Sequence, residues 1–320
     1  MQRGISFQKG LTYLDRRRRG MSVETYRRHS RTLSYPRGIV LDSDNKVHIP
    51  YTDFYLAFGC NLKCKSCSLL NPFRSGIVPK DKLIESFDKW SKRVVPATVA
   101  LLGGEPFLNP DIAEIAAAAK NAFTQSLIAI ITNGVLLPKV PDKILQSLGE
   151  NGISVYISQH LNTDEFRQTL ERGIERLEHY AINYELHDGY SKWAKLLATD
   201  TQNAPVPCSS NAEIAYENCF CCKYCTAIHG EHLYRCSLVA NMVFAVKEGV
   251  LNSGWHRVLK HQPVTLESTP QEILHYLRGG AMAECSICPE KSELTEARQL
   301  TGEEVRVIKE RIREEKRKAA

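Results

Sequence analysis

The sequence contains no long hydrophobic stretch. No segment of its 320 residues approaches the roughly twenty consecutive apolar residues that a membrane-spanning helix needs. Residues 1–20 also lack the apolar centre of a secretory signal peptide. We therefore expect a soluble, cytoplasmic protein that has no membrane partner.

A strong excess of one charge is absent as well. The formal net charge is +6, which is modest for this length, and the basic residues concentrate at 15–20 and in the C-terminal tail. A nucleic-acid-binding groove would combine basic and aromatic side chains, and no such combination accompanies these ends. Solvated terminal segments explain the charge better, so a nucleic-acid partner is not expected.

Cysteine, in contrast, is abundant. The chain has 11 cysteines, an odd number that cannot pair completely, and disulfides are rare in a reducing compartment. Three of them stand at Cys60, Cys64 and Cys67, and the other eight lie between Cys208 and Cys288. We expect these thiols to be metal ligands for the most part.

Apolar segments alternate with amphipathic ones from residue 52 to about 187. In residues 81–94, Leu83, Phe87 and Trp90 recur at helical spacing, while the residues at 97–104 form a short apolar run. Nearly all-apolar strands between helices predict an α/β fold whose parallel sheet is covered by helices, with five or six β/α units in an open barrel. The other expected strands are 46–59, 126–134, 152–159 and 181–188, and the other expected helices are 109–122, 141–151 and 163–180.

The end of this alternation after residue 187 suggests how the chain is divided. We expect a basic N-terminal extension at 1–50, the α/β core at 51–190, a cysteine-rich module at 191–292 and an exposed helical tail at 293–320. Within the core, Asn109 is expected to cap a helix whose first residue is Pro110.

The segment FGCNLKCKSCSLLNP, residues 58–72, spaces its cysteines as C-x3-C-x2-C directly after an expected strand. Three thiolates can hold three irons of a [4Fe-4S] cluster and leave the fourth iron without a protein ligand. A structural zinc site would normally need four ligands, and no histidine or fourth cysteine lies near this loop.

With GGEP at 103–106, ITNG at 131–134 and YISQH at 156–160, this loop resembles the radical S-adenosylmethionine (SAM) superfamily. The resemblance implies a partial (β/α)6-type barrel in which Cys60, Cys64 and Cys67 bind a catalytic [4Fe-4S] cluster whose open iron chelates SAM. It also implies a flavodoxin- or ferredoxin-type electron donor. The residues implied to contact SAM are Gly103, Gly104, Glu105, Pro106, Thr132, Asn133, Ser158 and Gln159. The Glu105 carboxylate would accept a hydrogen bond from the ammonium group of the methionine part of SAM. Ser66 stands where the superfamily often has an aromatic residue, and Phe58 or Phe73 would then supply apolar cover.

The second group of cysteines resembles the auxiliary-cluster extensions of the same superfamily, called twitch or SPASM domains. Residues 225–236 are expected to form a β-hairpin that delivers Cys236, and CSIC at 285–288 returns to the same place. The implied ligands of one further [4Fe-4S] cluster are Cys225, Cys236, Cys285 and Cys288. Cys219, Cys221 and Cys222 compete with Cys225, and a zinc ribbon is the alternative for this module.

The resemblance predicts an enzyme that cleaves SAM to a 5′-deoxyadenosyl radical and abstracts a substrate hydrogen atom. An oxidation of a sugar- or polyol-type small molecule is the expected reaction, and modification of a peptide or protein side chain is the alternative. A non-catalytic iron–sulfur or zinc regulator of nucleic acid is the alternative of another class. Polar residues of the connector at the open end of the barrel are candidates for substrate contact: His187, Asp188, Tyr190, Lys192 and Trp193.

Overall fold

The computed structural model describes residues 39–187, 189–190, 193–219, 225–291, 293–295 and 297–319. Residues 1–38 of the expected N-terminal extension lie outside the described residues, as do Asp188 and Lys192 of the connector. Cys221 and Cys222, which compete for the second ligand set, also lie outside them.

One large sheet organises the described chain. Its strand order is β12-β11-β10-β2-β3-β4-β5-β6, with β1 paired to β2 at the side. Strands β2 to β6 are parallel neighbours in chain order, and β10 joins the opposite edge of β2, also parallel. The bounds are β1 Val40–Leu41, β2 Val47–Ala57, β3 Val94–Gly103, β4 Leu127–Thr132, β5 Ser154–Ser158, β6 Tyr184–His187, β10 Thr226–His229, β11 His232–Tyr234 and β12 Val264–Thr265.

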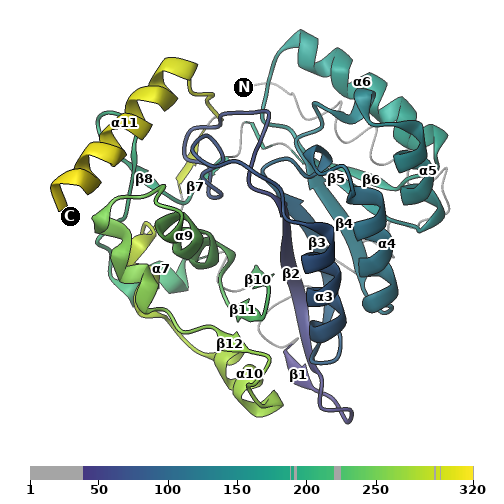
Figure 1. The fold of residues 1–320 in the computed structure, drawn as a ribbon, viewed down its shortest axis with the longest axis horizontal. Helices are drawn as coiled ribbons and strands as arrows, with labels where there is room; N and C mark the ends of the chain where they lie inside the picture. Colours follow the sequence, from purple (N-terminus) through teal and green to yellow (C-terminus); the bar gives the residue numbers. More distant parts are fainter. Residues whose placement is uncertain are drawn as a thin grey trace.

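Four helices connect the parallel strands β2 to β6. They are α3 (Lys80–Trp90), α4 (Ile112–Ala122), α5 (Asp142–Glu150) and α6 (Asp164–His179). Figure 1 shows them together on one side of the strands, with the green and yellow C-terminal elements on the opposite side. The predicted α/β class with a parallel sheet is confirmed. The sixth parallel strand is β10, which pairs with β2 at one edge of the parallel strands. It does not follow β6 at the other edge, where a continued β/α alternation would have placed it.

The two faces of β2 belong to two different apolar cores. Phe54 and Leu56 are buried with the side chains of the covering helices. Tyr55, between them in sequence, is buried with the residues of helix α9 (Ser237–Lys247). Alternation along a strand therefore places the helix layer on one side and the C-terminal part of the chain on the other.

The predicted cap at Asn109 is wrong. Helix α4 begins at Ile112 after Asp111, and no side chain caps it. The Asn109 amide instead donates to the carbonyls of Leu56 and Val78 at 3.0 and 3.1 Å. Asn109 therefore ties the segment after β3 to the end of β2, because these buried carbonyls need donors.

The C-terminal half adds short elements around the hairpin β10–β11. They are β7 Trp193–Lys195, β8 Ala198–Thr199, β9 Pro205–Val206, α7 Ala212–Glu217, α10 Pro270–Arg278 and β13 Glu293–Thr295, and the 3-10 helices are η1 Pro106–Leu108, η2 Leu137–Lys139, η3 Ser253–Lys260 and η4 Ala283–Ile287. The large sheet crosses the expected boundary at residue 190, since β10, β11 and β12 belong to it. The division into domains stays a prediction.

The C-terminal tail is helical, as expected, but it is not simply exposed. Helix α11 spans Gly302–Ala319, and its Val305, Ile308 and Ile312 are buried. These side chains form a small core with Leu300 and Ala204, against which Phe73 packs. The apolar stripe on this charged helix explains the difference, because such a stripe must be covered by other parts of the fold.

Among the helices of the described residues, none is both long enough and apolar enough to cross a membrane.

Candidate functional site

The loop that carries Cys60, Cys64 and Cys67 follows β2 and is wound into successive tight turns. The amide of Cys67 donates to the carbonyl of Cys64 at 3.3 Å, and that of Leu70 donates to Cys67 at 2.9 Å. Ser66 and Leu70 adopt left-handed backbone conformations, with φ of 61° and 57°. Such residues are uncommon, so the surrounding contacts hold this loop in a costly shape.

Of the three thiol residues, Cys64 is buried, and Cys60 and Cys67 are half-buried. Burial raises the pKa of Cys60 and of Cys64 to about 12, and it also raises the pKa of Cys67. These thiols are therefore protonated at neutral pH in the metal-free chain. Binding a metal as thiolates requires the loss of these protons.

The glycines of the GGEP segment bring the end of β3 against the cysteine loop. The amide of Gly104 donates to Ala57 at 2.8 Å, and the amide of Glu105 donates to Gly59 at 3.0 Å. A Cβ atom on Gly104 would lie 1.9 Å from the carbonyl oxygen of Gly59. Only glycine allows this approach, so the segment positions the loop directly.

Glu105 joins the GGEP segment to the ITNG segment. Its fully buried carboxylate accepts from the Thr132 hydroxyl at 2.7 Å, from the Asn133 amide at 3.0 Å and from the Phe107 amide at 3.2 Å. Burial raises the pKa of Glu105 to about 7, and the hydrogen bonds from Asn133, Thr132 and Phe107 oppose that effect. The hydrogen-bond donors to Glu105 among the described residues therefore all belong to this chain. A contact of Glu105 with the methionine ammonium of SAM stays a prediction.

Asn133 extends this connection to the first cysteine. Its side-chain amide donates to the Asn61 carbonyl oxygen at 2.7 Å and lies 3.6 Å from the Cys60 sulfur. The side chain of Asn133 also accepts from the Val135 amide at 3.0 Å, which fixes its orientation. The predicted site residues of β3, β4 and the cysteine loop therefore meet at one place.

The end of β5 approaches the second cysteine. His160 lies with Nδ1 3.4 Å from the Cys64 sulfur and with Nε2 2.8 Å from the Ser158 hydroxyl. Burial lowers the pKa of His160 to about 4, so the ring is neutral at neutral pH. No role was predicted for His160 of the YISQH segment, because the ring reaches its partner only in the folded chain.

Several buried side-chain donors have no partner within the described residues, and two of them belong to residues next to this site. Gln159 follows β5, and its side-chain nitrogen Nε2 is one of them. Arg74 Nη1 is the other, and the positive charge of Arg74 acts to lower the pKa of Cys67. Unpaired buried donors are costly, and an anionic ligand is a group that would satisfy them. The residues present therefore fit an iron–sulfur cluster with SAM.

The Radical SAM superfamily matches residues 54–185. That range contains the cysteine loop and the three segments that meet it. This part of the chain is therefore a radical SAM domain. Members of the superfamily use a [4Fe-4S] cluster and SAM.

The solved structures similar to this chain have low sequence identity to it. The structure of anSMEcpe with bound AdoMet and Cp18Cys peptide is 19% identical, covering 43% of this chain and 42% of that one, with a TM-score of 0.35. BtrN in complex with AdoMet and 2-DOIA is 15% identical, covering 74% and 84%, with a TM-score of 0.42. SuiB from Streptococcus suis bound to S-adenosylmethionine is 14% identical, covering 86% and 77%, with a TM-score of 0.35. The chain spans only 42% and 43% of the two anSMEcpe chains.

The second predicted cysteine set lies beyond the radical SAM domain, near the start of helix α9. Cys236 is the residue before α9, and the amide of Ser237 donates to the Cys225 carbonyl at 2.9 Å. Cys236 and Cys285 are buried in one apolar core, and Cys288 and Cys219 pack against it. Within the described ranges, no three His, Cys, Asp or Glu side chains converge on a point that could hold a single metal ion. A [4Fe-4S] cubane does not need such a point, because each of its thiolate ligands binds a different iron.

Asp53, which was not predicted as a site residue, is a buried acid beside this second set. It is 5% exposed, and its Oδ1 has no partner among the described residues. Burial raises the pKa of Asp53 to about 7, against hydrogen bonds from the side chains of Tyr51 and Ser237. A lone aspartate inside the apolar strand YTDFYLAF was the signal that could have revealed it.

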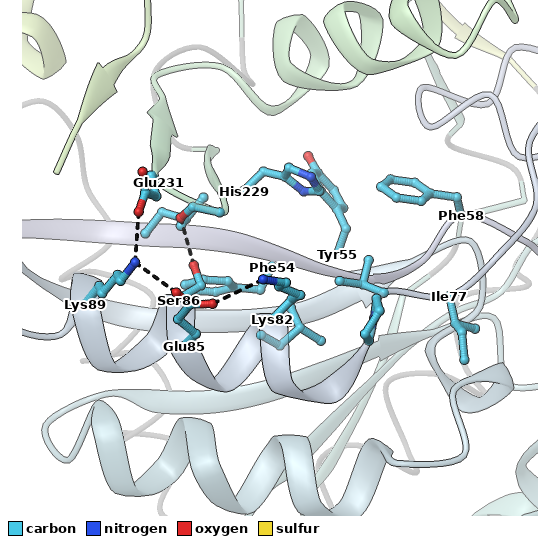
Figure 2. Close-up of a pocket in the computed structure, with 15 residues that line it drawn as sticks. Phe54, Tyr55, Phe58, Ile77, Lys82, Glu85, Ser86, Lys89, His229 and Glu231 are labelled. Atoms are coloured by element: carbon cyan, nitrogen blue, oxygen red, sulfur yellow. Dashed lines mark hydrogen bonds and ion pairs between the residues drawn. The ribbon is translucent and has the colours of Figure 1, made fainter.

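A separate cavity of about 470 Å³ lies between helix α3 and the β10–β11 hairpin. Figure 2 shows Phe54, Tyr55 and Phe58 along it, with Lys89 bridging Glu85 and Glu231 at one end. Burial lowers the pKa of His229, which lines the cavity, to about 4. The predicted cysteine ligands and the predicted SAM contacts of β3, β4 and β5 are not among its lining residues, but Phe58, one of the two residues expected to supply apolar cover, is.

The connector residues predicted to contact substrate are only partly described. His187 ends β6 and is exposed, and the Tyr190 carbonyl accepts from the amide of Ala297 at 2.8 Å. Trp193 begins β7, which pairs with β13.

Proposed function

We propose that this chain is a radical SAM enzyme that oxidises a hydroxyl-bearing small molecule, such as a sugar or polyol, to the corresponding carbonyl compound. Cys60, Cys64 and Cys67 would hold the catalytic [4Fe-4S] cluster. The observation that carries the cluster assignment is the convergence on this loop of Asn133 at Cys60 and His160 at Cys64. These two partners come from the ends of β4 and β5, and they favour a built cluster site over a loop with accidental cysteines.

Residues at the carboxyl ends of the parallel strands would hold SAM beside this cluster. Gly103 and Gly104 let the backbone approach closely, and Glu105 keeps the ends of β3 and β4 together. The unpartnered Nε2 of Gln159 would donate to a carboxylate or ribose oxygen of SAM, with Ser158 beside it.

The face of β5 and β6 that points away from the helices carries polar side chains, which favours a polar substrate. On β5, Val155 and Ile157 are buried on the helix side, while Tyr156 and Ser158 alternate with them and are half-buried. Tyr156 pairs in register with Glu185, and Ser158 pairs with His187. Side chains that pair in register share a face, so a phenol, a carboxylate, a hydroxyl and an imidazole stand together. Such groups are suited to binding hydroxyl groups.

The oxidation balances if a second redox group is present. The substrate loses one hydrogen atom from carbon, then one proton and one electron, and a carbon–oxygen double bond remains. When bound, the cluster supplies the electron that cleaves SAM to methionine and a 5′-deoxyadenosyl radical, and an auxiliary cluster accepts the electron from the substrate. We propose Cys225, Cys236, Cys285 and Cys288 as ligands of that auxiliary cluster. The start of α9 at Cys236 favours negative charge there.

The first experiment counts metal. Protein purified without oxygen should contain about eight irons per chain if both cysteine sets hold [4Fe-4S] clusters. Replacing Cys236 by Ala should leave about four irons and retain SAM cleavage, whereas zinc in the second set would overturn the auxiliary-cluster assignment.

The second experiment tests the reaction. Reconstituted enzyme with SAM and dithionite is incubated with a panel of carbon-deuterated sugars and polyols, and products are analysed by mass spectrometry. Deuterium should appear in 5′-deoxyadenosine, and the unlabelled substrate should yield a product two mass units lighter. A product one methyl group heavier, or one of unchanged mass, would contradict an oxidation.

A further inference from the structure

The C-terminal segment 297–300 lies along the loop that carries the three cysteines. The amide of Lys65 donates to the Arg298 carbonyl at 2.7 Å, and the amide of Leu300 donates to the Lys63 carbonyl at 2.8 Å. Cys64 and Gln299 form an antiparallel bridge between these segments. We call residues 297–300 the strap. Its residue Gln299 contacts Cys64 although the two are 235 residues apart in sequence.

Both ends of the strap are fixed. At the first end, the amide of Ala297 donates to the Tyr190 carbonyl at 2.8 Å. At the second end, Thr301 and Glu304 cap helix α11: the Thr301 amide donates to the Glu304 carboxylate at 2.7 Å, and the Glu304 amide donates to the Thr301 hydroxyl at 3.1 Å. The buried side chain of Leu300 joins the apolar core of α11. The strap is therefore held in place independently of its contact with Cys64.

The side chain of Gln299 makes two contacts with the cysteine loop. Its Oε1 accepts from the backbone amide of Lys63 at 2.8 Å, and its Nε2 lies 3.1 Å from the sulfur of Cys64. A backbone N–H can only donate, so the atom that faces Lys63 must be the carbonyl oxygen of Gln299. The donor nitrogen is thereby directed at the sulfur of Cys64.

We propose that Gln299 is a positioning residue for the first cysteine set, and that its hydrogen bond to Cys64 raises the reduction potential of the cluster held there. Donation to a thiolate sulfur stabilises the more negative, reduced state of an iron–sulfur cluster. Cys64 is 5% exposed, so water does not substitute easily for this donor. The inference rests on the proposed assignment of Cys60, Cys64 and Cys67.

Two substitutions separate the donor from the rest of the contact. Gln299→Glu keeps an oxygen for the Lys63 amide and removes the donor, while Gln299→Met removes both hydrogen bonds and retains side-chain length. Gln262→Leu is the control, because Gln262 is exposed and its side chain donates to the Lys260 carbonyl at 3.4 Å, within its own loop. Each reconstituted full-length chain is titrated with dithionite and followed by electron paramagnetic resonance, with and without SAM.

The signal that changes when SAM is added identifies the cluster of the first set. Its midpoint potential should shift to more negative values in Gln299→Met and further in Gln299→Glu, and it should be unchanged in Gln262→Leu. Unchanged potentials in both Gln299 variants would overturn the inference. Loss of the near-ultraviolet circular dichroism in both would do so as well, because Gln299 would then be a structural residue. Absence of any SAM-responsive signal in the parent chain would refute the proposed function instead.

Discussion

The carboxylate of Glu105 accepts a hydrogen bond from the hydroxyl of Thr132 at 2.7 Å, and this contact joins the ends of two neighbouring strands. Its other oxygen accepts from the Asn133 amide at 3.0 Å. Since Asn133 also contacts Cys60, the orientation of the first cysteine depends on a residue that does not touch it.

Replacing Glu105 by Ala should destabilise the chain, because two buried donors lose their acceptor. Each unsatisfied group costs about 1–3 kcal/mol, so the free energy of unfolding should fall by about 2 kcal/mol or more. Urea unfolding of the metal-free protein measures this change. Glu267→Ala, at an exposed position, is the control, and an equally small effect of both substitutions would contradict the assigned role.

The buried acid Asp53 should make stability depend on pH. Its pKa rises from 3.8 to about 7 on folding, so its ionised form is disfavoured in the folded chain. The stability contributed by neutral Asp53 is therefore complete below about pH 4 and is lost as the pH rises toward 7.

Asp53→Asn stays neutral throughout and should gain stability relative to the parent across that interval. Urea unfolding of both metal-free proteins at pH 5 and pH 8 tests this. Glu105, whose pKa is raised in the same direction, is present in both proteins and cancels in the comparison. A difference in unfolding free energy that does not vary with pH would refute the prediction.

Gly104→Ala should disrupt the cysteine loop, because the new methyl group would lie 1.9 Å from the Gly59 carbonyl oxygen. A clash with backbone cannot be relieved by a side-chain rotation, so we expect a loss of about 2 kcal/mol or more and a lower iron content. Gly280→Ala is a matched control, since nothing lies within 4 Å of its added carbon atom. Equal iron content in the two variants would show that the close approach is dispensable.

Much of the fold could be predicted from local patterns. Strands such as β4 are short apolar runs between turn residues, and α6 is capped by Thr163, whose hydroxyl accepts a hydrogen bond from the Phe166 amide at 3.1 Å. The radical SAM assignment also followed from local spacing, since the cysteine loop and GGEP are each continuous in sequence.

Contacts between distant segments could not be predicted in the same way. Nothing in the local sequence of Asn109 distinguishes a helix cap from a donor to Leu56 and Val78. Likewise, the contact of Gln299 with Cys64 depends on the capping of α11 and on Leu300. Position in the folded chain determines these roles, and residue type alone does not.

The central claim is that Cys60, Cys64 and Cys67 support reductive cleavage of SAM. The most direct measurement is the yield of 5′-deoxyadenosine from anaerobically reconstituted protein with SAM and dithionite, compared between the parent chain and Cys64→Ala. Cys236→Ala serves as the control for loss of a cysteine outside this loop. The account predicts 5′-deoxyadenosine from the parent chain, a residual yield from Cys236→Ala and none from Cys64→Ala. Equal yields from the parent and Cys64→Ala, or none from a fully iron-loaded parent, would contradict it.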